Sequence, residues 1–298
     1  PITITGSSDA VLKAPADNDG AVLQIDSNHI HLTGLTITGL LDSDAPDDPA
    51  SYHADKLISL NGDVSDPEDY LEGLVVSPNR LGNTGQSLIN SQQIKNCDIG
   101  GFRVIGPAGT KWILDGSEGH NGEIVYLGTA SDNRLERGYE TYDRTRNIRV
   151  HHIDNSAGHP HAELVDCKAG TENITIEYCT SGGGTQANEG GWTRAISLDG
   201  IGCTVRHNIV HGVEGDGVRI GPQRFLSSFD EDGEQKVKYT LQALPKTEFE
   251  RKLGKGHAIY DNVFTAYTQD AINFYRLSRR FGRESNQRPE DQQVLCGN

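Results

Sequence analysis

A short apolar pattern that recurs along the chain is the feature that most limits the folds open to this sequence. Five segments share two apolar residues one position apart: "IVYLG" (124–128), "LVDCK" (164–168), "AISLD" (195–199), "GVRIG" (217–221) and "AINFY" (271–275). The equivalent positions are Val125, Val165, Ile196, Val218 and Ile272, so the spacings are 40, 31, 22 and 54 residues. A coil of about 22 residues with variable insertions at one corner reproduces these spacings.

A second kind of β-rich segment alternates with the first. It occurs at 147–154, 173–180, 203–210 and 257–264, with Gly and Asn at the corners and no helical periodicity. One coil cannot bury its own apolar face, whereas stacked coils line Val, Ile, Leu and Phe into a continuous interior. The sequence therefore predicts an all-β, single-stranded parallel β-helix that occupies residues 1–298 as one domain.

A β-sandwich is the alternative fold, and its turns argue against it. Sandwiches favour two-residue turns such as Asn-Gly between adjacent strands. The "NG" pairs at 61–62 and 121–122 do not join two strands of matched pattern. We therefore keep the β-helix.

Three polar segments interrupt the repeat and are expected to be loop insertions. They are residues 40–55, 129–146 and 222–256, and "TEFERKLGK" (247–255) in the last one predicts a short helix. Long loops in compact folds are often functional lids or binding walls. We expect all three to leave the coil on the same side.

Composition limits the partners and the location. The net charge of −15 argues against nucleic acid and anionic membranes, which favour basic patches. No apolar run approaches the ~20 residues of a membrane span. The chain starts at Pro1 and has no methionine, so we expect a processed, secreted protein that is a monomer. Its five cysteines lack CxxC spacing, and leave room for one or two disulfides.

Period-2 alternation also predicts a column of polar side chains on the opposite face of the repeated strand. The outward positions and the bends just before the strands carry Glu123, Tyr126, Glu163, Asp166, Lys168, Arg194, Ser197, Asp199, Asp216, Arg219, Asp270, Asn273 and Tyr275. Adjacent coils lie ~4.8 Å apart, so these side chains form one surface that we expect to face solvent. The plain alternative to a functional site is a solvated face with salt bridges such as Lys168 with Asp199.

The coil pattern resembles the right-handed parallel β-helices of the pectate-lyase-like superfamily over residues 92–275. The runs "GEIVYLGTA" and "AELVDCKAGTENITIEYC" carry this resemblance. A narrower likeness is to the chondroitinase B and alginate lyase family, in which a calcium-ligating Glu stands five residues before a catalytic Lys, as Glu163 stands before Lys168. That family has an acidic residue where this chain has His161, and an arginine where it has Asp199. Arg219 lies one coil further on.

The resemblance implies a lyase that cleaves an acidic polysaccharide by calcium-assisted β-elimination. It implies Ca²⁺ ligands at Glu163, Asp166 and Asp199, and a base, Lys168, whose pKa Ca²⁺ and Arg219 would lower. Arg219 would otherwise bind the substrate carboxylate, and Tyr126 or Tyr275 would protonate the leaving oxygen. The expected substrate-binding residues are His161, Trp192, Arg194 and Tyr275. A uronate C5-epimerase, a glycoside hydrolase and a non-catalytic carbohydrate-binding solenoid remain alternatives.

Overall fold

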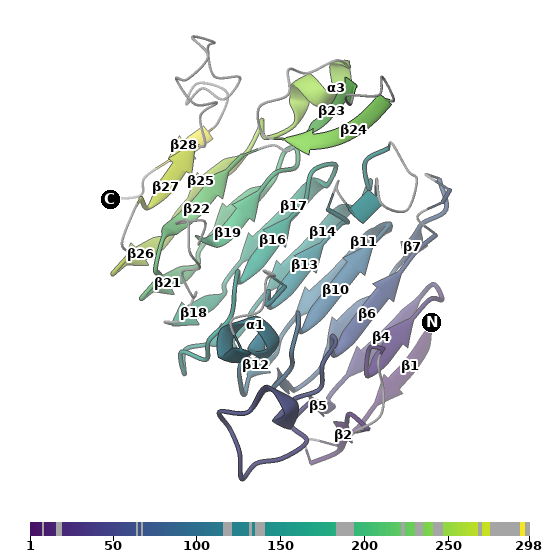
Figure 1. Ribbon diagram of the computed structural model, residues 1–298, viewed down its shortest axis with the longest axis vertical. Helices are drawn as coiled ribbons and strands as arrows, with labels where there is room; N and C mark the ends of the chain where they lie inside the picture. Colours follow the sequence, from purple (N-terminus) through teal and green to yellow (C-terminus); the bar gives the residue numbers. More distant parts are fainter. Residues whose placement is uncertain are drawn as a thin grey trace.

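The chain winds into three long parallel sheets that lie along one another and together form an elongated coil (Figure 1). The computed structural model describes residues 1–7, 9–15, 20–63, 65–66, 68–115, 121–130, 133–134, 141–182, 194–221, 224–229, 235–240, 247–267, 270–274 and 293–295. We name the sheets I, II and III. A typical coil enters sheet I, continues through sheet III and then sheet II, and returns to sheet I on the next coil.

The strands are short. Sheet I contains β3 (Leu23–Ile25), β6 (Ile58–Asn61), β10 (Ile89–Gln92), β13 (Val125–Leu127), β16 (Val165–Cys167), β19 (Arg194–Leu198), β22 (Asp216–Ile220) and β27 (Ile272–Phe274). Sheet II contains β2 (Val11–Lys13), β5 (Thr36–Thr38), β9 (Arg80–Gly82), β12 (Arg103–Val104), β15 (Asp154–Asn155), β18 (Thr180–Gly182), β21 (Ile209–His211) and β26 (Val263–Thr265). Sheet III contains β1 (Ile2–Thr5), β4 (Ile30–Thr33), β7 (Leu71–Glu72), β8 (Val75–Ser77), β11 (Ile94–Gly100), β14 (Arg146–His151), β17 (Glu172–Glu177), β20 (Thr204–Arg206), β25 (Ala258–Tyr260) and β28 (Gln293–Leu295).

The interior of the coil confirms the predicted alignment of the repeat. Val125, Val165, Ile196, Val218 and Ile272 are consecutive register partners across sheet I. The first four are fully buried in the main apolar core, and Ile272 packs against it. The predicted single-stranded, right-handed parallel β-helix is therefore confirmed.

Asparagines hold one corner of the coil in a backbone conformation that few residues adopt. Asn96, Asn147 and Asn173 have φ angles of +53°, +56° and +55°. Asn is among the residues that tolerate this left-handed region best. Asn147 donates a side-chain hydrogen bond to Asn96 (3.0 Å), and Asn173 donates one to Asn147 (3.3 Å). The stacked amides thus align the same bend in three successive coils.

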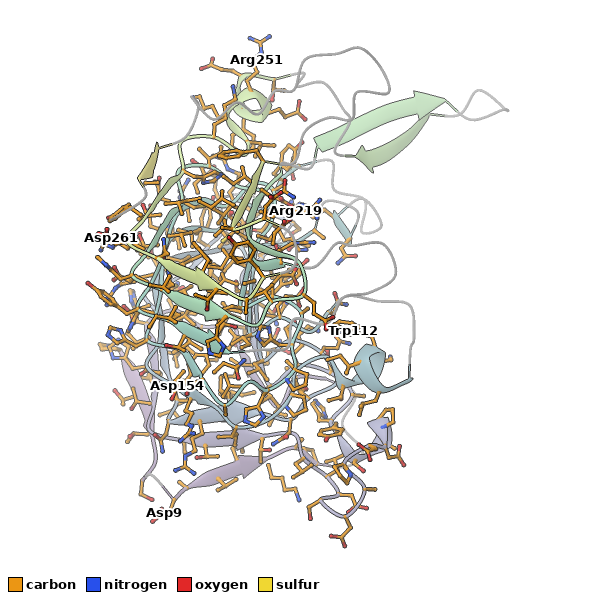
Figure 2. The ribbon with its side chains drawn as sticks, turned by 90° about the vertical axis from the view of Figure 1, so that its left-hand side faces the viewer. Asp9, Trp112, Asp154, Arg219, Arg251 and Asp261 are labelled. Carbon is orange, nitrogen blue, oxygen red and sulfur yellow. The ribbon has the colours of Figure 1, made fainter. Side chains whose placement is uncertain are left out.

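Short helices and one hairpin lie outside the three sheets, most of them in the insertions. A 3-10 helix (Pro49–Ser51) lies in the first insertion, and an antiparallel hairpin of β23 (Arg224–Phe229) and β24 (Gln235–Thr240) projects from the third (Figure 2). The predicted short helix is confirmed as α3 (Glu248–Lys252), which a Thr247–Glu250 capping box begins. Helix α1 (Thr110–Asp115) was not predicted from the sequence. The middle insertion, residues 129–146, lies partly outside the described residues.

The second and third insertions contact each other next to sheet I. The Tyr142 hydroxyl donates a hydrogen bond to Glu250 Oε1 (2.8 Å), and the Tyr142 and Phe249 ring centroids lie 5.5 Å apart. Tyr142 also forms a small buried cluster with Leu253 and Ala169, the residue after Lys168. The second and third insertions thus pack against the turn that follows β16.

The cysteines among the described residues are all buried and unbridged. Cys97, Cys167, Cys179 and Cys203 are buried free thiols, so these four form no disulfide with one another, and Cys296 lies outside the described residues. Within the described parts of the chain, no helix has both the length and the apolar character needed to cross a membrane.

Candidate active site

The charged residues singled out in the sequence lie on the outer face of sheet I. Asn90, Tyr126, Asp166, Ser197 and Arg219 are consecutive register partners on β10, β13, β16, β19 and β22. Because side chains alternate along a strand and neighbouring strands are in register, these residues form one outward row. The structure therefore brings Tyr126, Asp166 and Arg219 onto one surface, as expected.

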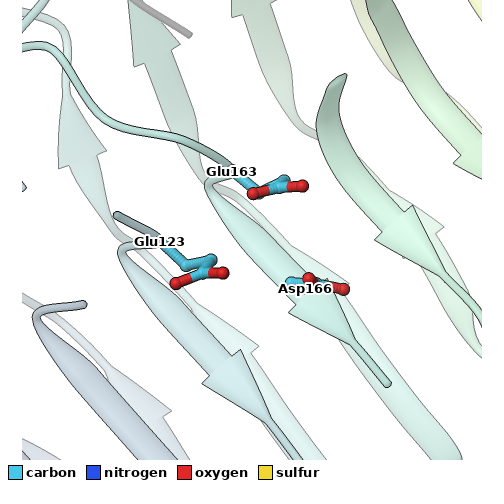
Figure 3. A group of neighbouring side chains, drawn as sticks. All are labelled: Glu123, Glu163 and Asp166. Atoms are coloured by element: carbon cyan, nitrogen blue, oxygen red, sulfur yellow. The ribbon is translucent and has the colours of Figure 1, made fainter. Parts of the chain in front are cut away.

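A second row stands at the bends that lead into these strands. Glu123 precedes β13 and Glu163 precedes β16, each two residues before the paired Val125 and Val165. A backbone hydrogen bond from Ile124 to the Glu163 carbonyl (2.8 Å) holds the two bends together. Figure 3 shows Glu123 and Glu163 at these bends, with Asp166 further along β16.

This surface is buried, and the prediction that it faces solvent is wrong. The exposed fractions are 1% for Glu123 and Asp166, 4% for Asp199, and 6% for Glu163, Arg219 and Tyr126. The charged side chains also contact one another across strands ~4.8 Å apart, as the Arg194–Glu163 pair shows. Charged groups that are buried require partners, so this arrangement cannot be treated as a solvated strand face.

The cationic side chains bind carboxylates within the cluster. Lys168 Nζ lies 2.5 Å from Asp166 Oδ2. Arg194 lies 2.9 Å from Glu163 Oε1 and 4.0 Å from Asp166 Oδ2. Lys168 therefore pairs with Asp166, two positions before it in the chain, rather than with Asp199, the partner considered from the sequence.

Three carboxylates approach closely enough to share a metal ion. Oxygen atoms of Glu123, Glu163 and Asp166 all lie within 4.8 Å of one another. Glu163 and Asp166 were predicted ligands. Glu123 takes the place expected for Asp199, which is outside this group. The signal for Glu123 was present in the sequence, because it occupies the same position of the repeat as Glu163.

The chemistry of these residues fits a divalent cation. Oε2 of Glu123 is buried and accepts no hydrogen bond from the described residues. Burial and the neighbouring Glu163 carboxylate raise the pKa of Glu123 to about 8. A buried oxygen without a donor and a carboxyl group that resists ionisation are what a bound cation would correct. Carboxylate oxygens are the ligands that Ca²⁺ prefers.

The pKa values of the other carboxyl groups shift in opposite directions. Burial and the Asp166 charge raise the pKa of Asp199 to about 7. Burial also raises the pKa of Glu163, despite Arg194. Burial acts in the same direction on Asp166, but Lys168 and Arg194 outweigh it and hold the pKa of Asp166 below its usual value. The cluster therefore holds a firmly ionised Asp166 among carboxyl groups that are harder to ionise.

The pKa of Lys168 moves opposite to the direction expected for a base. Burial lowers it, but Asp166, Tyr126, Glu123 and Glu163 together raise it well above the ordinary value. The Arg219 effect expected from the sequence is not among the main influences. Without a cation on the carboxylates, Lys168 is therefore protonated.

Tyr126 lies against Lys168. The Lys168 ammonium is 4.7 Å from the centroid of the Tyr126 ring, a cation–π contact. The Tyr126 hydroxyl accepts a hydrogen bond from the Ala130 backbone (3.1 Å), which leaves its own proton to donate. Burial raises the pKa of the phenol, which therefore stays protonated over the physiological range.

Of the remaining predicted binding residues, His161 is described and does not join the cluster. His161 is buried, and its Nε2 lies 3.1 Å from Ser181 Oγ on β18 of sheet II. Burial lowers the pKa of His161 to about 4, so the ring is neutral. Trp192 and Tyr275 lie outside the described residues. Of the two predicted binding residues that the structure describes, Arg194 lies at the site and His161 does not.

Comparisons with known proteins identify the fold. No family model matches the sequence, and no curated protein matches it. The structure is similar to that of an alginate lyase from Paenibacillus sp. str. FPU-7, with a TM-score of 0.60 and 15% identity over 92% of this chain and 82% of that chain. It is also similar to a mutant tailspike protein of E. coli bacteriophage HK620 in complex with a hexasaccharide, with a TM-score of 0.51 and 13% identity over 99% of this chain and 43% of that chain. These likenesses establish a parallel β-helix of the kind found in those two proteins.

Proposed function

We propose that this protein is a secreted polysaccharide lyase that cleaves a uronic-acid-containing polysaccharide by calcium-assisted β-elimination. The observation that carries this proposal is the buried group of Glu123, Glu163 and Asp166 beside Lys168 and Tyr126. The names of the two structural neighbours, an alginate lyase and a tailspike bound to a hexasaccharide, support a saccharide ligand.

The reaction removes the C5 proton next to the carboxylate of a uronic acid. Negative charge develops on that carboxylate, so groups that oppose the charge stabilise the transition state. Glu123, Glu163 and Asp166 would hold the cation, whose positive charge would neutralise the substrate carboxylate. Arg219 lies in the same outward row as Asp166, and its guanidinium suits a bidentate bond to a carboxylate.

Lys168 is the proposed base. Its neighbouring carboxylates hold its pKa high, so neutralising their charge is the step that would release its proton. Tyr126 is the proposed acid, because its phenol remains protonated and lies against Lys168. The two groups can therefore act on the same sugar unit, one taking the C5 proton and the other protonating the leaving oxygen.

A substrate screen tests the reaction class. The purified protein would be incubated with pectate, alginate, glucuronan and chondroitin, with calcium and with EDTA, while ultraviolet absorbance of unsaturated products is followed. We expect one polymer to give unsaturated ends that disappear on chelation. Absence of unsaturated product from every polymer, with calcium present, would contradict the proposal.

A glycoside hydrolase is the second candidate, and the pKa values favour it specifically. Hydrolases pair a protonated carboxylic acid with an ionised carboxylate. Glu123, with a pKa of about 8, and Asp166, with a lowered pKa, form such a pair. In the same screen a hydrolase would release reducing ends without the absorbance of unsaturated sugars.

A further inference from the structure

A polar hollow adjoins the charged cluster on its N-terminal side. Its volume is about 110 Å³, and the described residues that line it include Lys56, Gln86, Asn90, Gln92, Asn121 and Tyr126. A water molecule occupies ~30 Å³ in the liquid, so the hollow holds on the order of four waters, enough for part of one sugar unit.

The hollow is continuous with the proposed active site. Tyr126 lines the hollow and its ring also contacts Lys168. Gly128 lines it too, and a Cβ atom built on Gly128 would lie 3.5 Å from the Lys168 Cβ. Asn90 is two strands from Asp166 in the same row, which corresponds to ~10 Å. A chain whose reacting sugar lies at Lys168 would therefore place a neighbouring sugar in the hollow.

The lining of the hollow carries little net charge. Its described side chains are amides, hydroxyls and one lysine, Lys56, whose ammonium lies 2.7 Å from Asp55 Oδ1. The neutral character continues onto β6, where Asn61 Oδ1 accepts hydrogen bonds from Ser59 (2.9 Å) and Gln92 (3.1 Å). Amides and hydroxyls both donate to and accept from sugar hydroxyl groups.

Among the described residues that line this hollow, the one cation that a carboxylate would meet is Lys56, which is already paired with Asp55. Burial of an unpaired charge is costly, whereas a neutral sugar loses only hydroxyl hydration that the amides replace. The reacting centre nearby differs, because its three carboxylates beside Lys168 and Arg194 could hold a cation. With that cation bound, the outer face of sheet I would have one half suited to a uronate and one half suited to an uncharged sugar.

We infer that the substrate is a heteropolysaccharide in which a neutral sugar is the neighbour of the uronic acid, rather than an uninterrupted polyuronate. The inference deepens the proposed function, because it takes Lys168 as the position of the uronate. Asn90 and Gln92 are then specificity-determining residues for the neutral unit.

Binding and cleavage, measured separately, test the inference. Oligosaccharides of hyaluronan and unsulfated chondroitin, which alternate glucuronate with a neutral N-acetylated sugar, would be compared with alginate and galacturonate oligomers of equal length. Calorimetry with Lys168→Ala prevents turnover, and wild-type cleavage is followed in parallel. We expect at least tenfold tighter binding of an alternating chain. Polyuronates that bind as tightly as every alternating chain would overturn the inference.

Variants link the preference to the hollow. Asn90→Asp combined with Gln92→Glu places carboxylates in it and should weaken alternating-chain binding at least tenfold. Asn28→Asp, the same kind of change at an exposed bend, is the control and should leave binding unchanged, because a carboxylate there can still accept the hydrogen bond from the Glu72 backbone. Equal binding by the double variant and the control would also overturn the inference. Preferred binding without cleavage would retain it and reject the lyase.

Discussion

The outer faces of sheets III and I both carry carboxylates beside cationic side chains, but the charges are ordered differently. On sheet III the signs alternate: Arg149 lies 3.5 Å from Asp98 and 2.7 Å from Glu177, and Arg206 lies 2.6 Å from Glu177. On sheet I three carboxylates of the same sign lie within 4.8 Å of one another. The arginine side chains of sheet III are 45% and 36% exposed, whereas that of Lys168 is 13% exposed.

The pKa directions show what this difference means. Burial would raise the pKa of Glu177, but hydrogen bonds from Arg149 and Arg206 hold it below its usual value. The pKa of Glu123 instead rises to about 8. The Glu177 carboxylate of sheet III is therefore stabilised by the arginines beside it, whereas the carboxylates of sheet I need an additional positive charge to be stabilised as anions. Strongly perturbed groups of the second kind mark functional sites more often than alternating ladders do.

The largest expected effect is on kcat, which should fall when a cation is removed from sheet I but not when one is removed from sheet III. Lys168→Ala should lower kcat by about 10²–10⁴-fold on the polymer found in the screen, because it removes the proposed base. Arg149→Ala, a cation-to-alanine change on sheet III, should retain wild-type kcat. Circular dichroism and thermal melting check that both variants fold. Wild-type turnover in Lys168→Ala would refute the assignment of the base.

The next largest effect is on the free energy of unfolding, which the same Glu→Gln change should raise on sheet I and lower on sheet III. Because the folded-state pKa of Glu123 lies above its ordinary value of 4.5, stability falls as pH rises from 4.5 to about 8, and the loss is complete once the buried carboxyl has ionised. Glu123→Gln should therefore stabilise the EDTA-treated protein at pH above ~8 by up to a few kcal/mol. Glu177 has a lowered pKa, so its ionised form stabilises the fold, and Glu177→Gln should cost about 1–3 kcal/mol.

Denaturant unfolding of both variants across pH measures these changes. Calcium provides the control: it should raise the Tm of the wild-type protein and do so less in Glu123→Gln. Destabilisation of the same size in both glutamine variants, at all pH values, would show that the two faces do not differ.

The sequence predicted the positions in the coil and not the environment at those positions. Alternation aligned Val125 with Val165 and Ile196, and therefore also placed Asp166 on the outward row, because register in a parallel sheet is fixed by the buried face. Burial of that row depends on neighbours from other coils, such as Arg194 beside Glu163. The insertions add contacts of longer range, such as Tyr142 with Glu250, which are 108 residues apart. No local pattern encodes such a contact.

The same reason explains the errors at the site. The pKa of Lys168 depends on carboxylates of two coils, Asp166 on its own strand and Glu123 on the preceding coil. The metal group contains Glu123 rather than Asp199 because carboxylate distances depend on side-chain reach across strands. The repeat did contain the information that Glu123 and Glu163 are equivalent, and a comparison of bends as well as strands would have found it.

The smallest expected effect concerns the stability of the alternating ladder. Arg149 is nearly half exposed, and Arg206 still pairs with the buried Glu177 carboxylate when Arg149 is removed. The part lost is therefore the solvent-screened interaction of an exposed cation, which contributes little. Arg149→Ala should therefore reduce the free energy of unfolding by no more than about 1 kcal/mol, and the loss should shrink in ~1 M salt, where the screening length falls to about 3 Å. Denaturant unfolding at low and high salt measures this loss. A loss of several kcal/mol that persists in high salt would mean that sheet III, like sheet I, depends on buried charge.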